Sequence, residues 1–498
     1  MAQTNTAAGV ASPAHPSGLR GHPRGLMTLF FTEMWERFSY YGMRALLVLY
    51  LVKALGYSRS DALELYGIYT GLVYLTPLAG GYLADRYLGM RQGAVIGAIV
   101  MMLGHFAMAF EPLLHSALGL LIVGNGFFKP NTSSMVGRLY REHDPRRDGG
   151  YTIFYMGVNL GALFSPLVAG TLGERIGWHW GFASAGVGMA IGLATLLRWQ
   201  GLLGDAGLRP GQKAISRRDW GVILLVSAAS VPGVFLAIQI WNLVSGVITP
   251  LPLAAKLVLA LGITGAVGWL PARFSGRDPG TQPLTRADWN AILAICVVVF
   301  FVIFFWMGFE QAGGTMNLFA DKQTDRHVFS WEIPASWFQS VNPLGIVLLA
   351  PAFSMIWTKL DRSKYAISDP TKQALGMMVL GLGFVVLAIA QGRAEQFGTV
   401  GPQWLIAVYL VHTIGELMLS PVGLSMVSKL APARFASLLM AVWLFSSAVA
   451  NYLSGTLEAM LAGSGIPLYW FLVGSSFGAG LILLGLTPWL GILTRGRG

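Results

Sequence analysis

The chain has 498 residues, of which 54% are hydrophobic and only 11% are charged, and its mean hydropathy is +0.59. This composition excludes an ordinary water-soluble globular fold, whose surface would carry many more charges, and indicates an integral membrane protein. The net charge of +11 does not indicate nucleic-acid binding, because the basic residues gather in alternate loops, as is typical of membrane topology. We therefore expect the lipid bilayer, and no nucleic acid, as a partner.

Residues 1–24 hold Ala, Gly, Pro, Ser, His and Arg without the apolar core of a secretory signal, which predicts a cytoplasmic N-terminal tail. Apolar runs long enough to cross about 30 Å of hydrocarbon follow along the rest of the chain. They begin near residues 26, 62, 91, 117, 150, 179, 219, 251, 289, 335, 370, 402, 434 and 467. The sequence thus predicts fourteen transmembrane helices.

An even number of helices leaves both ends of the chain on one side of the membrane. Most of the 34 Lys and Arg residues fall in the tails and the even-numbered loops. The positive-inside rule therefore predicts that both the N-terminus and the C-terminus are cytoplasmic.

The predicted helices form two halves, separated by a pair at 219–243 and 251–272 that carries almost no charge. We interpret this pair as an inserted hairpin, because its removal leaves six plus six helices, the arrangement of a transporter with two bundles around a central site. The predicted domains are the tail at 1–24, an N-terminal six-helix bundle at 25–204, a linker with the hairpin at 205–285, a C-terminal six-helix bundle at 286–492 and a cytoplasmic tail at 493–498. The predicted fold class is an all-α integral membrane protein.

The first predicted helix carries four ionisable residues well inside its apolar run, namely Glu33, Glu36, Arg37 and Arg44. One charge at the bilayer centre costs about 2.5 to 3.5 kcal/mol. Helical spacing places Glu33, Arg37 and Arg44 on one face, with a tyrosine pair between them. We expect this face to look into a hydrated cavity or at charged partners, because lipid would exclude it.

Three further charges lie inside later helices, namely Lys129, Glu310 and Glu416. By sign alone, Arg37 and Lys129 of the first half suit a carboxylate, and Glu416 of the second half suits an ammonium group. A short peptide has both groups, and its length grows by at most about 3.3 to 3.6 Å per residue, so fixed charge clusters would accept dipeptides and tripeptides. Large aromatic faces suit variable side chains. The candidates for such faces are Tyr40, Tyr41, Tyr74, Trp306 and Trp443.

Several motifs point to known families. Residues 80–91 (GGYLADRYLGMR) resemble the loop signature of the major facilitator superfamily, and KLDR at 359–362 echoes it in the second half. Four further segments, in the family's order, resemble the proton-coupled oligopeptide transporters of that superfamily. They are ExxERFxYYG at 33–42, FFKPNTS at 127–133, GVNLG at 157–161 and GELxxSPVGL at 415–424. The fourteen-helix pattern is similar to bacterial members, which implies the major facilitator fold and a multi-pass protein of the bacterial inner membrane.

The resemblance also implies roles for individual residues. Arg37 and Lys129 would meet the carboxylate of a peptide, and Glu416 its amino group. Asn159 and Asn342 would hydrogen-bond the peptide backbone or terminus. The remaining lining would come from Tyr40, Tyr41, Tyr74, Trp306, Glu310, Ser420 and Trp443.

Proton coupling needs carboxylates whose proton affinity depends on the conformation. Burial raises a carboxylate pKa and a nearby cation lowers it, so a Glu that moves relative to Arg or Lys links proton binding to movement. The expected pairs are Glu33 and Glu36 with Arg37, Glu310 with Arg44, and Glu416 with Lys129. Animal relatives use a histidine on helix 2; this chain has none there, so its proton relay would use glutamates.

Other functions fit the sequence less well. The chain shows no nucleophile with a base and no paired His spacing, so we expect no enzyme activity, catalytic residue, metal or cofactor. A nutrient receptor with a transporter fold would tend to lack the expected ion pairs. A symporter of the same fold for nitrate or a peptide-like drug is the nearest alternative. We expect the protein to act as a monomer with peptides and protons as its partners.

Overall fold

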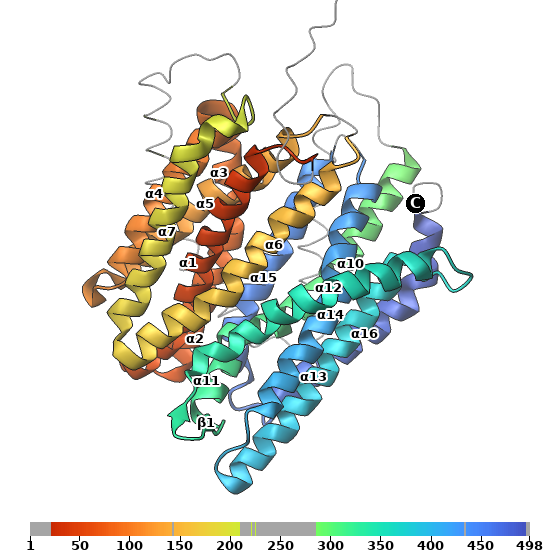
Figure 1. The fold of residues 1–498 in the computed structure, drawn as a ribbon. Coiled ribbons are helices and arrows are strands. Elements are labelled where there is room, and N and C mark those ends of the chain that lie inside the picture. The colour runs from red at the N-terminus through yellow and green to blue at the C-terminus, as the bar shows by residue number, and fades with distance from the viewer. Residues whose placement is uncertain are drawn as a thin grey trace, which may run out of the picture.

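The computed structural model describes residues 21–141, 144–209, 285–432 and 435–494, with the isolated residues 221 and 225. Two groups of long helices stand side by side, one built from the chain before residue 209 and one from the chain after residue 285 (Figure 1). Apart from those two isolated positions, the predicted hairpin at 219–243 and 251–272 lies outside the described residues. The count of fourteen helices, like the division into domains, therefore stays a prediction.

The first bundle consists of long helices with short extensions. Its long helices are α1 (Gly25–Lys53), α2 (Arg59–Leu75), α4 (Met90–Ala107), α5 (Leu114–Arg138), α6 (Arg147–Ser165) and α7 (Trp178–Trp199). Its shorter elements are α3 (Pro77–Leu83), η2 (Ala84–Leu88), η3 (Glu111–Leu113), η4 (Pro166–Gly170), η5 (Leu172–Ile176) and η6 (Gln200–Leu203).

The second bundle repeats this pattern and adds a small hairpin. Its helices are α10 (Arg286–Phe309), η8 (Glu310–Gly313), α11 (Thr315–Lys322), η9 (Ala335–Ser340), α12 (Val341–Asp361), α13 (Asp369–Phe397), α14 (Gln403–Leu430), α15 (Ala436–Leu461) and α16 (Leu468–Leu493). The strands β1 (His327–Val328) and β2 (Trp331–Glu332) pair antiparallel, with Val328 opposite Trp331.

Local sequence signals explain several helix ends. The Ser58 hydroxyl accepts a hydrogen bond from the Asp61 N–H at 3.1 Å and caps the start of α2. Thr285 and Asp288 form a reciprocal capping box at the start of α10. Gly89 has a φ of +81°, which lets the chain turn sharply between η2 and α4 within the loop motif.

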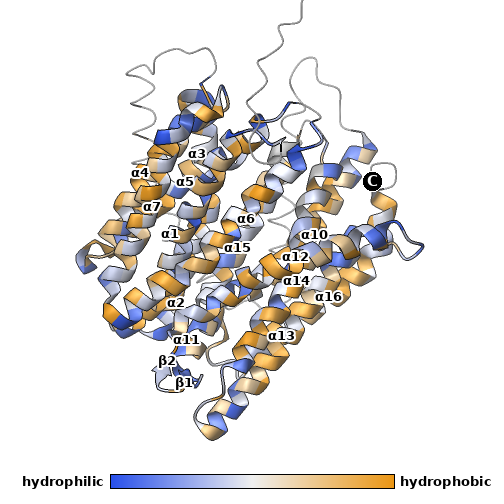
Figure 2. Cartoon of the chain, viewed as in Figure 1, coloured by the Kyte–Doolittle hydropathy of each residue, from blue (hydrophilic) through white to orange (hydrophobic). Residues whose placement is uncertain are grey.

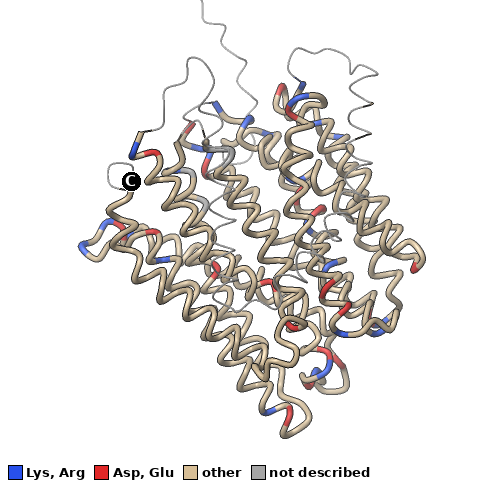
Figure 3. Tube along the Cα trace, turned by 180° about the vertical axis from the view of Figure 1, so that it is seen from behind, with Lys and Arg blue, Asp and Glu red and all other residues tan. Residues whose placement is uncertain are grey.

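The outer surface suits a lipid environment. Large apolar side chains are exposed on many helices, for example Leu103, Phe164 and Leu348. Figure 2 shows hydrophobic residues along the lengths of the helices, and Figure 3 shows that most charged residues gather towards the helix ends. Within the described part of the chain, eight helices are long and apolar enough to span a membrane. These features fit the predicted all-α membrane fold.

The described ion pairs that join the two bundles near the surface all lie at the end of the molecule where α1 ends, which we call the closed end. They are Lys53–Asp321, Arg59–Glu458 and Arg175–Glu332. At the same end α2 packs closely along α15, where a Cβ on Gly67 would lie only 2.8 Å from the Gly455 Cα. Glycine at both positions thus lets the two backbones meet.

At the opposite end, the described ion pairs stay within one bundle. Lys372 of α13 contacts Asp361 at 2.7 Å and Asp369 at 3.8 Å, and all three belong to the second bundle. Asp144 and Arg146 pair in the loop between α5 and α6 of the first bundle. The described contacts therefore hold the bundles together mainly at the closed end.

Candidate functional site

Helix α1 contains a buried ion cluster inside the first bundle. The Arg37 Nη2 donates to Glu36 Oε1 at 2.6 Å, its Nε also contacts Glu36, and the same Nε lies 3.5 Å from Glu33 Oε1. All three side chains are at most 3% exposed. The expected contacts of Glu33 and Glu36 with Arg37 are thus confirmed, one of them across a single helical turn.

Helix α5 presents three polar residues to this cluster at helical spacing. The Thr132 hydroxyl donates to Glu33 Oε2 at 3.0 Å, and the Asn125 Nδ2 lies 3.4 Å from Glu36 Oε1. Between them Lys129 places its Nζ 4.6 Å from the centre of the Tyr74 ring. Among the contacts of the described residues, Lys129 has no carboxylate partner at ion-pair distance, and its ammonium group lies against an aromatic face.

A second buried ion pair crosses from one bundle to the other. Arg44 of α1 contacts Glu310, which begins η8 at the end of α10, and its Nε donates to the Tyr66 hydroxyl at 2.6 Å. Both ionic side chains are under a tenth exposed. This confirms the expected contact between Arg44 and Glu310 across the interface.

The second bundle contributes another buried carboxylate. Glu416 of α14 is 8% exposed and accepts a hydrogen bond from the Asn342 Nδ2 at 2.9 Å. The same amide group donates to the Thr413 hydroxyl at 3.0 Å. An ion pair between Glu416 and Lys129 is not among the contacts of the described residues, so this structure does not contain the pair expected from the sequence.

The two tyrosines of α1 connect these charges. The Arg37 guanidinium lies 5.0 Å from the centre of the Tyr40 ring, and the buried Tyr40 hydroxyl has no hydrogen-bond partner among the described residues. Tyr41 is half-buried, and the centre of its ring lies 5.9 Å from the Arg37 guanidinium and 5.8 Å from that of Arg44, which contacts Glu310 of the second bundle. Charged groups of both bundles therefore meet around one tyrosine pair.

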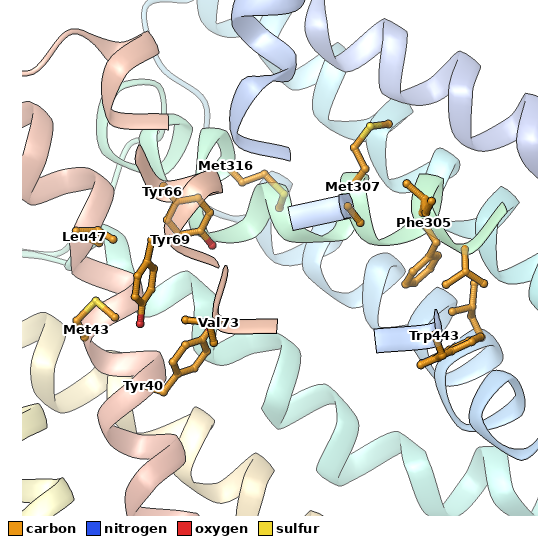
Figure 4. Close-up of a cluster of buried hydrophobic side chains, with 14 of the residues drawn as sticks. Tyr40, Met43, Leu47, Tyr66, Tyr69, Val73, Phe305, Met307, Met316 and Trp443 are labelled. Atoms are coloured by element: carbon orange, nitrogen blue, oxygen red, sulfur yellow. The ribbon is translucent and has the colours of Figure 1, made fainter. Parts of the chain in front are cut away.

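The other candidate residues lie in less polar surroundings. Trp306 packs against Phe309 of the same helix, and its buried indole N–H finds no hydrogen-bond partner in the part of the chain that the structure describes. Trp443 is 4% exposed and packs over Gly423. Figure 4 shows Trp443 with Phe305 and Met307 of the second bundle, in a cluster that also includes Tyr40, Tyr66 and Tyr69 of the first.

Two candidates lie beside these groups on their own helices. Asn159 of α6 is 5% exposed and donates to the Tyr155 carbonyl at 2.9 Å, within its own helix. Ser420 is half-buried, one turn after Glu416 on α14. These positions do not by themselves assign a role in peptide binding to Asn159 or Ser420.

Sequence reasoning did not assign a role to four residues that hold the charged groups in place. Thr132 lies in the FFKPNTS motif, and Asn125 lies one turn before Lys129, so helical spacing alone could have identified both. Tyr66 and Thr413 could not be identified in this way, because their contacts depend on how separate helices pack. No group of three or more His, Cys, Asp or Glu side chains within the described ranges is placed to hold a metal ion.

Apolar helices in two bundles, with buried charges of both signs between them, define a multi-pass membrane transporter. A family model for the POT family matches residues 93–467. The chain belongs to this family of transporters and has the fold of the major facilitator superfamily, as expected for a bacterial member.

Curated relatives and solved structures match over nearly the whole chain. The uncharacterized transporter YclF of Bacillus subtilis is 38% identical over 486 residues, which are 95% of this chain and 95% of that protein. The peptide transporter YePEPT of Yersinia enterocolitica is 36% identical over 456 residues and 87% of each chain. A crystal structure of a peptide transporter POT in complex with sulfate is 37% identical, with a TM-score of 0.81, and the match covers 97% of this chain and 98% of that chain.

Proposed function

We propose that this protein is a proton-coupled symporter that imports dipeptides and tripeptides by alternating access, driven by the proton electrochemical gradient. Its relative YePEPT is named a peptide transporter. The observation that carries the proposal is the placement of Lys129, a cation with no carboxylate partner among the described contacts, on one bundle and of a buried carboxylate, Glu416, on the other.

The proposed cargo has a charge at each end. The peptide carboxylate binds Lys129 and Arg37 of the first bundle, and the ammonium group binds Glu416 of the second. Asn159, Asn342, Tyr40 and the other candidate residues complete the lining. Wherever the described hydrogen bonds leave capacity, a carboxylate can accept a further hydrogen bond from the peptide, and a side-chain amide can donate or accept one.

The proposed proton sites are the carboxylates of α1. Glu33 and Glu36 share one arginine, and the single positive charge of Arg37 cannot neutralise two ionised carboxylates. When one of them binds a proton, one carboxylate and one guanidinium of opposite charge remain. The arrival of a peptide carboxylate near Arg37 and Lys129 adds a further negative charge and favours that proton.

The proposed orientation places both termini in the cytoplasm of a bacterium and the closed end at the outer face of the inner membrane. The described structure then corresponds to a conformation closed to the outside. An inward potential of 100 mV is worth about 2.3 kcal/mol per charge, or nearly two decades of accumulation, so one proton per peptide is enough for useful uptake. A monomer contains all the proposed residues.

Uptake into proteoliposomes tests the proposal. The purified protein is reconstituted, a proton gradient and an inside-negative potential are imposed, and accumulation of a labelled dipeptide is measured. We expect accumulation that a protonophore abolishes. Binding of the dipeptide without accumulation would instead favour a nutrient receptor, and failure of both would reject a peptide as the cargo.

The Glu416→Gln variant separates peptides from other cargo. Nitrate has no ammonium group to bind Glu416, whereas a peptide or a peptide-like drug with a free amine does. We expect the variant to lose dipeptide uptake. Nitrate uptake by the wild type that persists in the variant would identify nitrate as the cargo and contradict the proposal.

A further inference from the structure

A row of hydrogen bonds connects α6 and its extensions in the first bundle to the start of α12 in the second. The Glu174 carboxylate of η5 accepts three of them, from the Ala335 N–H at 2.9 Å, the Ser336 N–H at 2.9 Å and the Ser336 hydroxyl at 2.6 Å. We call the full row the α6–α12 seam. Its other two bonds are Trp337 Nε1 to Thr171 Oγ1 at 3.0 Å and Ser340 Oγ to the Leu163 carbonyl at 2.8 Å.

The α6–α12 seam differs from the ion pairs at the closed end in the groups that it joins. Lys53–Asp321 and Arg59–Glu458 join side-chain tips, and Lys53 and Arg59 are each about two-fifths exposed, which makes such pairs weak. Glu174 instead holds two backbone N–H groups in the first turn of η9, where no helical carbonyl is available to accept them. A carboxylate that satisfies three donors at once fixes the position of that turn.

The same helix leads directly from the seam to the candidate site. η9 continues into α12, so Ser336 and Asn342 lie less than two turns apart on one rigid element. Asn342 donates to Glu416. On the facing side of the seam, α6 carries Asn159 one turn before Leu163. The seam therefore joins the two helices that carry the candidate asparagines.

We infer that Glu174 is a positioning residue. Its hydrogen bonds to the start of η9 hold the closed end together and place Asn342 beside Glu416. When the bundles separate at the closed end, the three hydrogen bonds break together and α12 is free to shift Asn342 relative to the carboxylate. Closure of the transporter is thereby linked to formation of the subsite that binds the ammonium end of the cargo. The second half of this inference rests on the proposed function.

The Glu174→Gln variant tests the inference with almost no change in size. Glutamine has one acceptor oxygen, which can keep the two bonds from Ser336 only if its NH₂ group faces the Ala335 N–H, so the full set of three hydrogen bonds cannot form. The matched control is Glu111→Gln, since Glu111 is an exposed glutamate in η3 at the same end of the first bundle. Ser336→Ala, which removes only the hydroxyl donor, serves as a milder second variant in case Glu174→Gln folds poorly.

The first measurement is a distance distribution across the closed end. Spin labels are attached at His115→Cys of α5 and Gln396→Cys of α13, both exposed, in a Cys296→Ser background, and measured by pulsed EPR in nanodiscs. We expect a larger long-distance population in Glu174→Gln, a smaller increase in Ser336→Ala and no change in Glu111→Gln. This readout requires no transport, so it is independent of whether the proposed cargo and proton coupling are correct.

The second measurement is the KM for a dipeptide in counterflow exchange. We expect Glu174→Gln to raise KM about tenfold, the loss of roughly one good hydrogen bond at the subsite, and Glu174→Asp to restore part of it because it keeps the carboxylate. Distance distributions that coincide for wild type and Glu174→Gln would overturn the inference. So would an equal shift in Glu111→Gln, or an unchanged KM in a variant whose closed end has opened.

Discussion

Helix α1 carries two sets of buried ion pairs that differ in what they join. Glu33, Glu36 and Arg37 form a cluster within the first bundle, whereas Arg44, two turns later, pairs with Glu310 of the second bundle. Both sets are almost fully buried, so both are protected from solvent screening. Only the second set must break when the bundles separate.

This difference assigns different tasks to similar residues. A pair within one rigid helix does not sense bundle separation by distance, so only a change of local charge, such as a bound proton or a peptide carboxylate, alters it. A pair across the interface responds directly to separation. This difference favours proton binding at the Arg37 cluster and gating at Arg44, and variants in each set of ion pairs test the assignment.

The largest effect is expected from Glu36→Gln. This change keeps the size of the side chain but removes a proton site from the cluster. Gradient-driven dipeptide uptake in proteoliposomes should be abolished, while counterflow exchange, which requires no net proton movement, should persist. Glu395→Gln, at an exposed glutamate near the end of α13, is the control and should leave both modes intact.

Glu33→Gln should behave in the same way, because Glu33 shares Arg37 and is held by Thr132. If either variant retained both transport modes at wild-type rates, that carboxylate would have no part in coupling. Loss of both modes in either variant would instead assign the residue to peptide binding or to folding.

The next effect concerns stability. Glu310→Gln leaves Arg44 buried without its counter-charge, and breaking a buried pair in this way costs about 3 to 5 kcal/mol. Thermal unfolding in detergent should show a clearly lower midpoint. The double variant Arg44→Gln with Glu310→Gln should recover much of the loss, because no uncompensated charge remains.

Lys53→Gln sharpens this test, because its pair with Asp321 also joins the bundles but is partly exposed. An exposed pair contributes about 0 to 1 kcal/mol, so the midpoint should barely move. Equal losses in Lys53→Gln and Glu310→Gln would show that bridging the bundles, rather than burial of charge, determines the effect.

A third experiment separates a cation that binds cargo from one that holds the fold. Lys129 is half-buried beside Tyr74, and no described contact pairs it with a carboxylate at close range, so Lys129→Met removes a charge without breaking a close ion pair. We expect dipeptide affinity to fall about tenfold to hundredfold, as for loss of a charge-assisted hydrogen bond. The unfolding midpoint should not fall, in contrast to Glu310→Gln.

The opposite result for Lys129→Met is also informative. Unchanged dipeptide affinity together with reduced stability would make Lys129 a structural partner of the Arg37 cluster. The binding site would then have to take its positive charge from Arg37 alone.

The sequence predicted the helices well because membrane helices follow simple rules. In the described ranges, α1, α2, α4 and most later helices begin within a few residues of the predicted starts. The reason is that an apolar run must be long enough to cross the hydrocarbon, and polar or charged residues end it. What the runs could not predict are the extensions η4 and η5 of α6, which begin at Pro166 and place Glu174 against the second bundle.

The candidate site was predictable only in part. Contacts within α1 follow from helical spacing, and opposite charge indicated the partner of Arg44 across the interface. The expected pair of Lys129 with Glu416 is not among the described contacts, in which Glu416 accepts a hydrogen bond from Asn342. Such a contact depends on how far apart the bundles stand in one conformation, and a sequence that must serve several conformations cannot specify it.

The smallest effect is expected in the loop between α5 and α6, outside the membrane. Hydrogen bonds from the side chain and backbone of Arg146 lower the pKa of Asp144 from 3.8 to about 2. Because the folded pKa lies below the unfolded value, the stabilisation is complete above that unfolded value and is lost only as pH falls towards 2. Between pH 5 and 8 this carboxylate stays ionised, so it cannot sense the proton gradient.

Asp144→Asn should therefore leave the pH dependence of dipeptide uptake unchanged, within about 0.3 units over pH 5 to 8. Uptake rates measured at half-unit intervals for wild type and Asp144→Asn check this directly. Counterflow exchange rates are measured over the same pH range for both and for Glu33→Gln, because gradient-driven uptake is lost in that variant. A flattened profile in Glu33→Gln with an unaltered one in Asp144→Asn assigns pH sensing to the buried α1 cluster. A shifted profile in Asp144→Asn would instead place part of the pH response in a surface pair, and the division of tasks along α1 would fail.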